Sequence, residues 1–574
     1  MNQKLENILN VSLDATEDEL RKADSLSTGY NWRDNTWEII VKYSGSLESI
    51  RNRYNVYIKE LLNYYAIIVA DKATIELISQ EDVIDYVEKP KSLYYQIERT
   101  KTAACVGSVR ADGNILSGKG VIVGVIDTGI DIFDNAFRNS DGTTRILNIY
   151  DQTTGEKYDK QSIDEYIRLN EDLSGGTFSY DNAPGVDNIM HGTDVSYIAA
   201  GSLGVAYEAD IIAVKMGYSI NNQFPRTTSL MDAIDYIIRK AIEYRKPVAV
   251  NISYGCNYGA HNGNTLLESF IDDISKSYRC VICVGSGNEA DKAIHFGGII
   301  NTGQVQTAYL SVGEYQSAID IQIWKNYWDT IDVMLINPRG EQIGIITEGR
   351  INRYETYNTE IITLLGEPSP YNIYQEIYIN LIPKTDYILS GIWQIVLMAG
   401  SIRAGEYNIW LPSSQALGYA TAFNNPTADG TITIPATARN CIAVGAYNAY
   451  TNSYAAFSGR GFDNSIRNVN AGVKPDITAP GVDISIARQR GNDITYRNVT
   501  GTSYAVPVVT GAAALLMQWG IVMGNDRFMY GEKLKAALIN GSKPVGLVGI
   551  TRNDNQPDPV SYTHLRAHET PEHL

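Results

Sequence analysis

Short, unbroken apolar runs that alternate with helical stretches are the sequence feature that most restricts the fold of this chain. Four such runs follow Gly120, each bounded by Gly or polar residues: VIVGVID, IIAVKM, PVAVNISYG and CVICVGSGN. Amphipathic stretches such as SLMDAIDYIIRKAIEYR lie between some of them. Strands that are apolar on both faces are typical of a parallel sheet covered by helices on both sides. We therefore expect an α/β fold built on a parallel sheet.

The helical pattern disappears between residues 303 and 425. Short alternating runs replace it, among them AIDIQIW, DTIDVMLINPRG, EIYINLIP and GEYNIWLP. Regularly spaced alternating strands with turn residues between them favour an antiparallel β-sandwich or jelly roll. The α/β pattern returns with ITIPATARNCIAVGAYN, so the sandwich is predicted to be an insert in a discontinuous α/β domain.

A separate unit precedes the parallel-sheet region. TWEIIVKYSG and YYAIIVAD are predicted strands, and LESIRNRYNVYIKELL between them has the pattern of a helix. A further helix and strand follow in ATIELISQEDVIDYVEKP, and the unit ends in the linker-like stretch PKSLYYQIERTK. These patterns predict a compact α+β domain at the N-terminus.

The charge balance excludes some classes of partner. The chain has 48 Lys and Arg against 65 Asp and Glu, a formal charge of −17. Binding to nucleic acid needs clustered basic residues, and an anionic membrane surface attracts them too, so neither partner is expected. No apolar stretch follows a basic one at the N-terminus, so no ordinary signal peptide is visible. With only five Cys in 574 residues, this favours synthesis in a reducing compartment.

Two segments resemble other kinds of site. Cys280 and Cys283 form a C-x-x-C pattern, which suits metal or redox chemistry. We favour a buried strand, where side chains three positions apart point to opposite faces. The uncharged 21 residues from Tyr504 to Gly524 are long enough to span a bilayer. Because this stretch holds Pro507 and lacks basic flanks, we favour a helix buried within the protein.

Three polar residues at the ends of apolar segments are candidates for catalysis. Asp127 ends the strand VIVGVID, at the edge of a parallel sheet where ligands bind. His191 begins a predicted helix, and Ser503 lies at the head of the long apolar helix, near free backbone N–H groups. Each alone has an ordinary structural explanation: an N-cap or turn aspartate, a structural histidine and an N-cap serine.

Together these residues and their surroundings resemble the subtilisin-like (subtilase) serine peptidases. The motifs that carry the resemblance are VIDTGID, HGTDV, NISYG, FSGRG, KPDITAPGVDI and GTSYAVP. The resemblance implies a serine endopeptidase in which Ser503 is the nucleophile, His191 the general base and Asp127 the group that orients the imidazole. Asn288, in VGSGNEA, corresponds to the oxyanion-hole asparagine of the family.

The same resemblance predicts how substrate binds. The run Ser253, Tyr254 and Gly255 corresponds to the strand on which an extended peptide substrate adds by backbone hydrogen bonds. The N-terminal α+β unit is expected to be a propeptide, a chaperone and inhibitor in cis that is cut autocatalytically within residues 91–100. The expected partners are therefore a polypeptide substrate and the chain's own propeptide.

The arrangement of propeptide, subtilase core and jelly-roll insert is similar to the Csp-type germination proteases of clostridia. This implies limited proteolysis of a protein zymogen during spore germination, with cytoplasmic synthesis and association with the spore. The alternative is a pseudoprotease or scaffold whose insert binds a protein or cell-wall partner. For cell-wall binding, the tryptophans of the insert are as easily core residues as sugar platforms: Trp324, Trp328, Trp393 and Trp410.

The predicted divisions of the chain are a propeptide (1–96), a first catalytic part (97–302), the insert (303–425), a second catalytic part (426–560) and a tail (561–574). No cofactor or metal is expected. The Asn-rich loop of the strong calcium site in secreted subtilisins is missing after His191, and weaker sites are left open. The tail SYTHLRAHETPEHL lacks periodicity and is interpreted as foreign sequence, with a His-rich metal site as the alternative.

Overall fold

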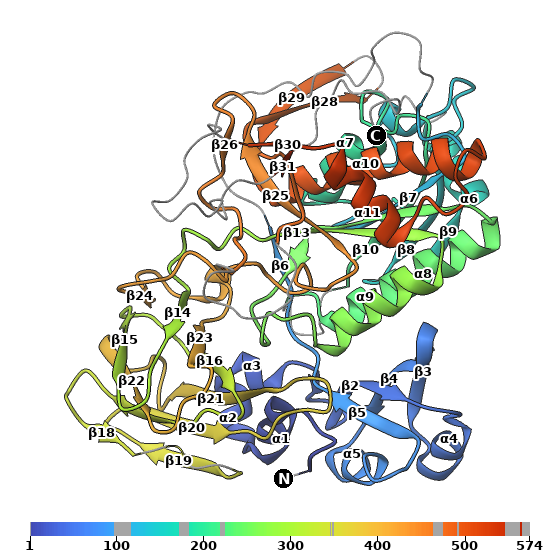
Figure 1. The fold of residues 1–574 in the computed structure, drawn as a ribbon. Helices are drawn as coiled ribbons and strands as arrows, with labels where there is room; N and C mark the ends of the chain where they lie inside the picture. The colour runs from blue at the N-terminus through green and yellow to red at the C-terminus, as the bar shows by residue number, and fades with distance from the viewer. Residues whose placement is uncertain are drawn as a thin grey trace.

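The computed structural model describes residues 2–96, 116–171, 183–217, 224–344, 346, 349–462, 474–490, 493–545 and 563–564. Three units are visible: an N-terminal α+β domain, a core with a large sheet between helices, and an antiparallel insert (Figure 1). The predicted α/β fold with a parallel sheet and an inserted antiparallel sandwich is confirmed.

The N-terminal domain is an antiparallel sheet with helices on one side. The sheet has the order β1-β2-β4-β3, and β5 pairs with β2. The strands are β1 (Tyr30–Asn31), β2 (Thr36–Tyr43), β3 (Tyr57–Leu61), β4 (Tyr65–Ala70) and β5 (Ile84–Glu88). The helices are α1 (Asn7–Asp14), α2 (Glu17–Lys22), α3 (Asp24–Ser27), α4 (Glu48–Tyr54) and α5 (Lys72–Ile78).

The long helix predicted between the first two strands is wrong in its second half. Helix α4 ends at Asn55, which has a left-handed backbone with φ 48°. Strand β3 follows directly and pairs with β4. An asparagine readily adopts this left-handed conformation and ends a helix. The alternating residues after it then form an edge strand.

The core sheet is parallel at its centre. Its order is β30-β31-β27-β25-β13-β11-β7-β10-β8-β9, with β26 beside β25. The parallel strands are β7 (Ile122–Asp127), β8 (Ile146–Asp151), β10 (Asp210–Lys215), β11 (Val248–Ile252), β13 (Cys280–Gly285), β25 (Ile442–Asn448) and β27 (Ile477–Pro480). The remaining strands are β9 (Glu156–Asp159), β26 (Ser453–Tyr454), β30 (Lys543–Pro544) and β31 (Thr563–His564).

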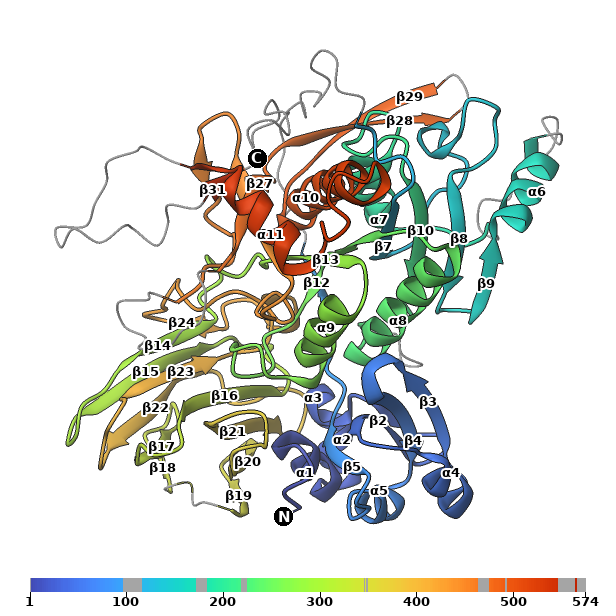
Figure 2. The same cartoon turned by 45° about the vertical axis from the view of Figure 1, so that its right-hand side comes forward.

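Helices cover both faces of this sheet (Figures 1 and 2). Side chains alternate along β7: Val123 and Val125 pack with one set of helices, and Ile122 and Ile126 with the other. The first face carries α7 (His191–Ala200), α10 (Thr502–Met517) and α11 (Gly531–Asn540), and the second carries α8 (Thr227–Tyr244) and α9 (Leu266–Ser277). Helix α6 (Lys160–Glu171) lies beside β8 and β9. Burial on both faces explains why these strands read as unbroken apolar runs.

Both segments that resembled other sites are part of the core. Strand β13, which holds Cys280 and Cys283, is buried throughout and both cysteines are free thiols. The uncharged segment forms α10 and a π-helical turn, Gln518–Val522. By length and composition Thr502–Val522 could cross a membrane, yet 72% of its most apolar window is buried inside the protein. The predictions of a buried strand and a buried helix are confirmed.

The insert consists of two antiparallel sheets with a shared apolar core. One sheet has the order β14-β23-β16-β21-β20-β19 and the other β18-β17-β22-β15-β24. The strands of the first are β14 (His295–Ile299), β16 (Ile319–Asn326), β19 (Ile351–Glu355), β20 (Thr359–Leu365), β21 (Tyr374–Pro383) and β23 (Glu406–Trp410). Those of the second are β15 (Val305–Val312), β17 (Ile331–Ile336), β18 (Gln342–Ile343), β22 (Gly391–Ala399) and β24 (Ala422–Phe423).

The structure shows where the insert begins and where two of its tryptophans lie. Its first strand begins at His295, before the predicted boundary at 303. The prediction missed this strand because Gly297 and Gly298 interrupt the alternating pattern there. Trp393 and Trp410 are buried in its core, so these two are packing residues, whereas Trp328 is exposed.

The N-terminal domain contacts both other units. Ile40, Tyr65 and Ile67 on one face of its sheet pack with α8 and α9. The opposite face shares an apolar cluster with four insert residues: Ile362, Leu364, Tyr378 and Ile382. Arg353 of β19 also forms ion pairs with Asp14 at 2.9 Å and with Glu19 at 2.7 Å. The domain is therefore held between the core and the insert.

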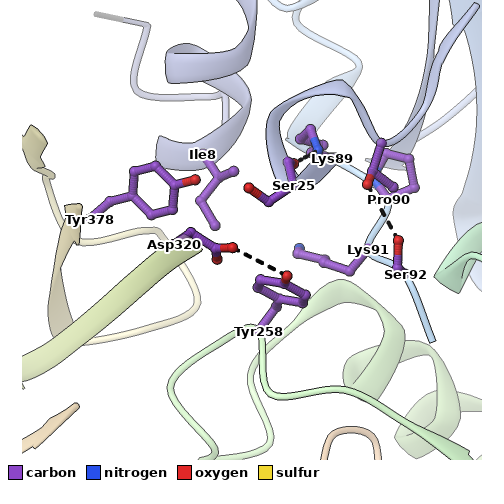
Figure 3. A pocket seen from close by; sticks show the side chains of 10 residues that line it. Ile8, Ser25, Lys89, Pro90, Lys91, Ser92, Tyr258, Asp320 and Tyr378 are labelled. Atoms are coloured by element: carbon purple, nitrogen blue, oxygen red, sulfur yellow. Dashed lines mark hydrogen bonds between the residues drawn. The ribbon is translucent and has the colours of Figure 1, made fainter. Parts of the chain in front are cut away.

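A small cavity marks the junction of the three units. Figure 3 shows Lys89 and Lys91 of the N-terminal domain beside Asp320 of the insert and Tyr258 of the core. The Tyr258 hydroxyl donates to Asp320 at 3.4 Å. Burial raises the pKa of Asp320 to about 6 and lowers the pKa of Lys89 to about 7. The strand that leaves this junction leads into the site described next.

The predicted foreign tail lies almost entirely outside the described residues. Within 561–574 only Thr563–His564 is described, as strand β31 between β27 and β30. The interpretation of this segment stays a prediction.

Candidate active site

Asp127 and His191 meet at the carboxyl edge of the parallel sheet. Asp127 is the last residue of β7, and His191 is the first residue of α7. His191 Nδ1 and Asp127 Oδ1 are 2.6 Å apart, and both side chains are 1% exposed. The Thr128 amide donates to the same carboxylate oxygen at 2.8 Å. Because Nδ1 of His191 is bonded to Asp127, Nε2 is the ring nitrogen left to act as a base.

The loop before α7 orients the histidine. Met190 has a left-handed backbone with φ 65°, and its amide donates to Asp187 at 2.7 Å. Asp187 also accepts hydrogen bonds from the Thr128 hydroxyl at 2.7 Å and from the Thr193 amide at 2.8 Å. A buried carboxylate with several donors is well compensated. Asp187 thus ties the end of β7 to the first turn of α7.

Opposing influences set the protonation of His191. Burial on its own lowers the pKa of a histidine, because it disfavours the charged form. The charge and hydrogen bond of Asp127 act in the other direction, with further contributions from Asp194 and Asp187. The net effect is a pKa of His191 above its ordinary value. A base with a raised pKa still accepts a proton readily near neutral pH.

Ser503 occupies the first turn of α10. Gly501, just before the helix, has φ 148°. Pro507 has no N–H and lies four residues after Ser503, so the Ser503 carbonyl has no helical partner. That carbonyl instead accepts a hydrogen bond from the Ser253 hydroxyl at 3.4 Å. The proline therefore frees a helix carbonyl that joins α10 to the neighbouring strand segment.

The hydroxyl of Ser503 contacts the end of the N-terminal domain. Its Oγ donates to the backbone carbonyl of Gln96 at 2.5 Å, and the Ser503 amide donates to the same oxygen at 3.4 Å. His191 Nε2 makes no hydrogen bond with any described residue. The ring of Tyr504 contacts that of His191 at 5.3 Å, so the histidine and serine lie in one site. Gln96 occupies that site.

Asn288 has an amide group available in this site. Its Oδ1 accepts hydrogen bonds from the Thr502 amide at 3.1 Å and the Thr502 hydroxyl at 3.0 Å. These bonds orient the side chain and leave Nδ2 buried, without a partner among the described residues. A buried, pre-oriented donor beside a serine nucleophile is suited to stabilise an oxyanion.

The segment before Gln96 pairs with the predicted substrate strand. Strand β6 (Tyr94–Tyr95) is antiparallel to β12 (Tyr254–Gly255), with Tyr95 opposite Tyr254. The Gln96 amide donates to the Ser253 carbonyl at 3.3 Å, and Gln415 Nε2 donates to the Tyr95 carbonyl at 2.5 Å. This is peptide binding by β-strand addition.

The side chain of Gln96 fills a pocket of matching polarity. Its Nε2 donates to the Gly285 carbonyl at 3.1 Å and to the Thr433 hydroxyl at 3.0 Å. A Cβ on Gly255 would approach Gln96 Nε2 to 2.7 Å, and one on Gly285 would overlap Oε1. The two glycines therefore leave room for this side chain. Gly255, predicted as part of the substrate strand, thus also makes space for the glutamine side chain.

Four residues of the site were not found from the sequence: Gln96, Gly285, Thr433 and Gln415. Gln96 lies inside residues 91–100, where the cut was predicted, and this position was the one indication in the sequence that Gln96 belongs to the site. Thr433 and Gln415 flank the insert boundary far from any catalytic motif, and no local pattern marks them. All seven predicted residues line this site: Asp127, His191, Ser253, Tyr254, Gly255, Asn288 and Ser503.

No metal-binding cluster occurs in the part of the chain that the structure describes: no three His, Cys, Asp or Glu side chains are grouped as ligands there. Calcium binding stays untested, as does the expectation of no cofactor.

The sequence matches the subtilase family over residues 118–368 and 404–560, and the chain belongs to this family of serine endopeptidases. Residues 3–91 match the Csp protease B prodomain, which identifies the N-terminal domain as a propeptide. The resemblance to subtilases and to Csp-type proteases is therefore confirmed.

Solved and curated relatives agree with this assignment. The CspB protease of Clostridium perfringens is similar with a TM-score of 0.71 and 33% identity, covering 79% of this chain and 92% of that one. Subtilase-type proteinase RRT12 of Saccharomyces cerevisiae is 33% identical over 128 residues, which are 22% of this chain and 23% of that one. Subtilisin-like protease 10 of Arthroderma otae is 34% identical over 120 residues, 21% of this chain and 27% of that one. The chain thus spans about a quarter of the length of these two curated relatives.

Proposed function

We propose that this chain is an active serine endopeptidase that cuts itself after Gln96 and then hydrolyses a protein substrate. The observation that carries the proposal is the position of Gln96: its carbonyl accepts the Ser503 hydroxyl, while its backbone and side chain are held by the substrate strand and the pocket. The hydrogen bond holds the serine oxygen against the carbonyl group to be attacked, and the hydroxyl must turn from the Gln96 oxygen to Nε2 of His191 before it reacts.

In the proposed reaction, Ser503 Oγ attacks the carbonyl carbon of Gln96 and transfers its proton to Nε2 of His191. Asp127 holds Nδ1 and stabilises the imidazolium that forms. The negative charge passes to the Gln96 oxygen, to which the Ser503 amide already donates. Asn288 Nδ2, which has no partner among the described residues, is available as the second donor. His191 then protonates the amine of residue 97 as the peptide bond breaks, and water hydrolyses the acyl-enzyme.

The contacts of the propeptide support a second part of the proposal, that the cut fragment blocks the site. The Gln96 amide donates to the Ser253 carbonyl, and the Tyr95 carbonyl accepts a hydrogen bond from the side chain of Gln415. The Lys91 carbonyl also accepts the first amide of α8, Thr227, at 2.9 Å, and Glu88 accepts the first amide of α9, Leu266, at 2.9 Å. A carboxylate is favourable at a helix N-terminus. Protein substrates would bind once this strand has left.

The biological role follows from similarity. We propose limited proteolysis of a zymogen during spore germination, as expected for Csp-type proteases, by a chain made in the cytoplasm. The retained contacts at Asp127, His191, Asn288 and Ser503 favour an enzyme over a pseudoprotease or scaffold.

The test uses the full-length chain and its Ser503→Ala variant. We expect the wild-type protein to separate into two fragments, with Ile97 as the new N-terminus by sequencing and intact mass. The Ser503→Ala protein should stay a single chain. A wild-type chain that remains whole after folding, or a fragment pattern independent of Ser503, would contradict the proposal.

A further inference from the structure

A buried ion cluster lies one helical turn beyond His191. Asp194 is on α7, and its side chain is fully buried. Two arginines reach it from a hairpin of β28 (Ile484–Arg490) and β29 (Asp493–Val499): Arg488 and Arg497. A buried carboxylate is costly unless it is paired and hydrogen-bonded. This acid is paired twice.

Arg488 contacts both ends of the first turn of α7. Its Nε donates to Asp194 Oδ1 at 2.9 Å, and its Nη2 donates to the Met190 carbonyl at 2.7 Å. Met190 directly precedes His191 and has the left-handed backbone described above. A planar guanidinium with several fixed donors can hold two acceptors at once. Arg488 therefore spans the turn that carries the histidine.

Arg497 connects the same turn to the nucleophile. It forms an ion pair with Asp194, and it lies near enough to the hydroxyl of Tyr504 to act against the rise that burial causes in the pKa of that group. Tyr504 follows Ser503 directly, and its ring contacts His191. The side chain of Arg497 is 40% exposed, so the cluster meets solvent on this side. The path from Asp194 through Arg497 to Tyr504 joins the helix of the histidine to the helix of the serine.

We propose that Asp194, Arg488 and Arg497 are positioning residues, which hold His191 in line with Ser503 and adjust its affinity for protons. In this proposal the hairpin of β28 and β29 fixes the position of α7 relative to α10. This inference rests on the proposed function, because it assigns the role of general base to His191.

The charges around His191 determine whether a substitution raises or lowers its pKa. The titratable and charged groups that face it come from β7, the loop before α7, α7 itself, the hairpin, α10 and β6: Asp127, Asp187, Asp194, Arg488, Arg497, Tyr504 and Tyr95. The negative charge of Asp194 favours protonated His191, and a nearby positive charge disfavours it. Burial raises the pKa of Asp194 to about 6, and Arg488 and Arg497 act against this rise. At pH values where Asp194 is ionised, removing one arginine should raise the pKa of His191, whereas replacing it with lysine should not.

The test compares Arg497→Gln with Arg497→Lys in the full-length chain. Each protein is isolated uncut from inclusion bodies in denaturant, refolded at acid pH where His191 is protonated, and moved to a series of higher pH values. Cleavage after Gln96 is followed on gels, which gives a plateau rate and the pH of half-maximal rate. Arg279→Gln, at an exposed arginine before β13, serves as the charge-matched control.

For Arg497→Gln we expect the half-maximal pH to rise by about half a unit to one unit, with a plateau about tenfold lower. For Arg497→Lys we expect the wild-type half-maximal pH and the lowered plateau, because the charge stays while the planar guanidinium that pairs with Asp194 is lost. Equal half-maximal pH values for both variants, or a loss that only follows the folded fraction by circular dichroism, would overturn the inference. A wild-type chain that is not cut would overturn the proposed function and this inference with it.

Discussion

Gly285 leaves the space that the side chain of Gln96 occupies. A Cβ on Gly285 would overlap Gln96 Oε1 and lie 3.0 Å from Cδ, while the Gly285 carbonyl accepts a hydrogen bond from Nε2. Gly285 therefore leaves space for the side chain of Gln96 and also binds it through a backbone hydrogen bond.

Gly285→Ala should therefore block self-cleavage without unfolding the protein. The new methyl group excludes glutamine from the pocket, and we expect the cleavage rate to fall by roughly 10²-fold, as for a misplaced reacting group. Gel analysis of fragment formation measures this. The double variant Gly285→Ala with Gln96→Ala should recover part of the rate, since the smaller side chain fits. Equal rates for the single and double variants would contradict the pocket assignment.

Asn288→Asp tests the oxyanion donor. The variant retains the Oδ1 acceptor for Thr502 and loses the Nδ2 donor. We expect cleavage to slow by at least about 10²–10³-fold, with little change in Tm. Single-turnover cleavage rates and differential scanning calorimetry measure the two quantities. A rate loss of less than about threefold would show that this amide does not stabilise the reaction.

Ile362→Ala tests the docking of the propeptide against the insert. Ile362 is fully buried in the cluster shared with the N-terminal domain. Truncating a buried isoleucine costs about 2–5 kcal/mol, so the cut fragment should dissociate from the rest of the protein more readily. Size-exclusion chromatography of the processed protein measures fragment retention.

Ile361→Ala is the matched control for that variant. Ile361 is the preceding residue of β20 and is buried in the insert's own core. We expect this change to lower the Tm while the fragment stays bound. Release of the fragment by both variants to the same extent would argue against a specific interface at Ile362.

Glu376→Gln should flatten the dependence of stability on pH. Burial raises the pKa of Glu376, and the negative charge of Glu6 raises it further. The positive charge of Lys91 acts in the opposite direction, and the resulting pKa is about 8. The folded protein keeps a proton on Glu376 that the unfolded chain releases above about pH 4.5, so stability falls as pH rises from there to about pH 8. A glutamine side chain has nearly the same size and shape as glutamate and carries no charge. Tm values across this range should decline less for the variant; parallel curves for both proteins would contradict the assignment.

Much of the fold was predictable because its signals are local. The strands of the parallel sheet are buried on both faces, which makes each one a continuous apolar run. In the insert, β15 and β17 alternate because one face of their sheet is exposed, whereas β21 of the other sheet is buried on both faces. The helix assigned across residues 47–62 was right for α4 and wrong after Asn55, because the pairing of β3 with β4 is set by the sheet.

The sequence by itself determined the family, the order of the units, and the identities of Asp127, His191, Asn288 and Ser503, because short motifs and strand patterns carry that information. Only the tertiary structure decided which residues surround them. Gln96 meets Ser503 across 407 positions of chain, and Arg488 meets Asp194 across 294. Contacts at such separations depend on how the sheet, the hairpin and the propeptide pack, and no local pattern encodes them.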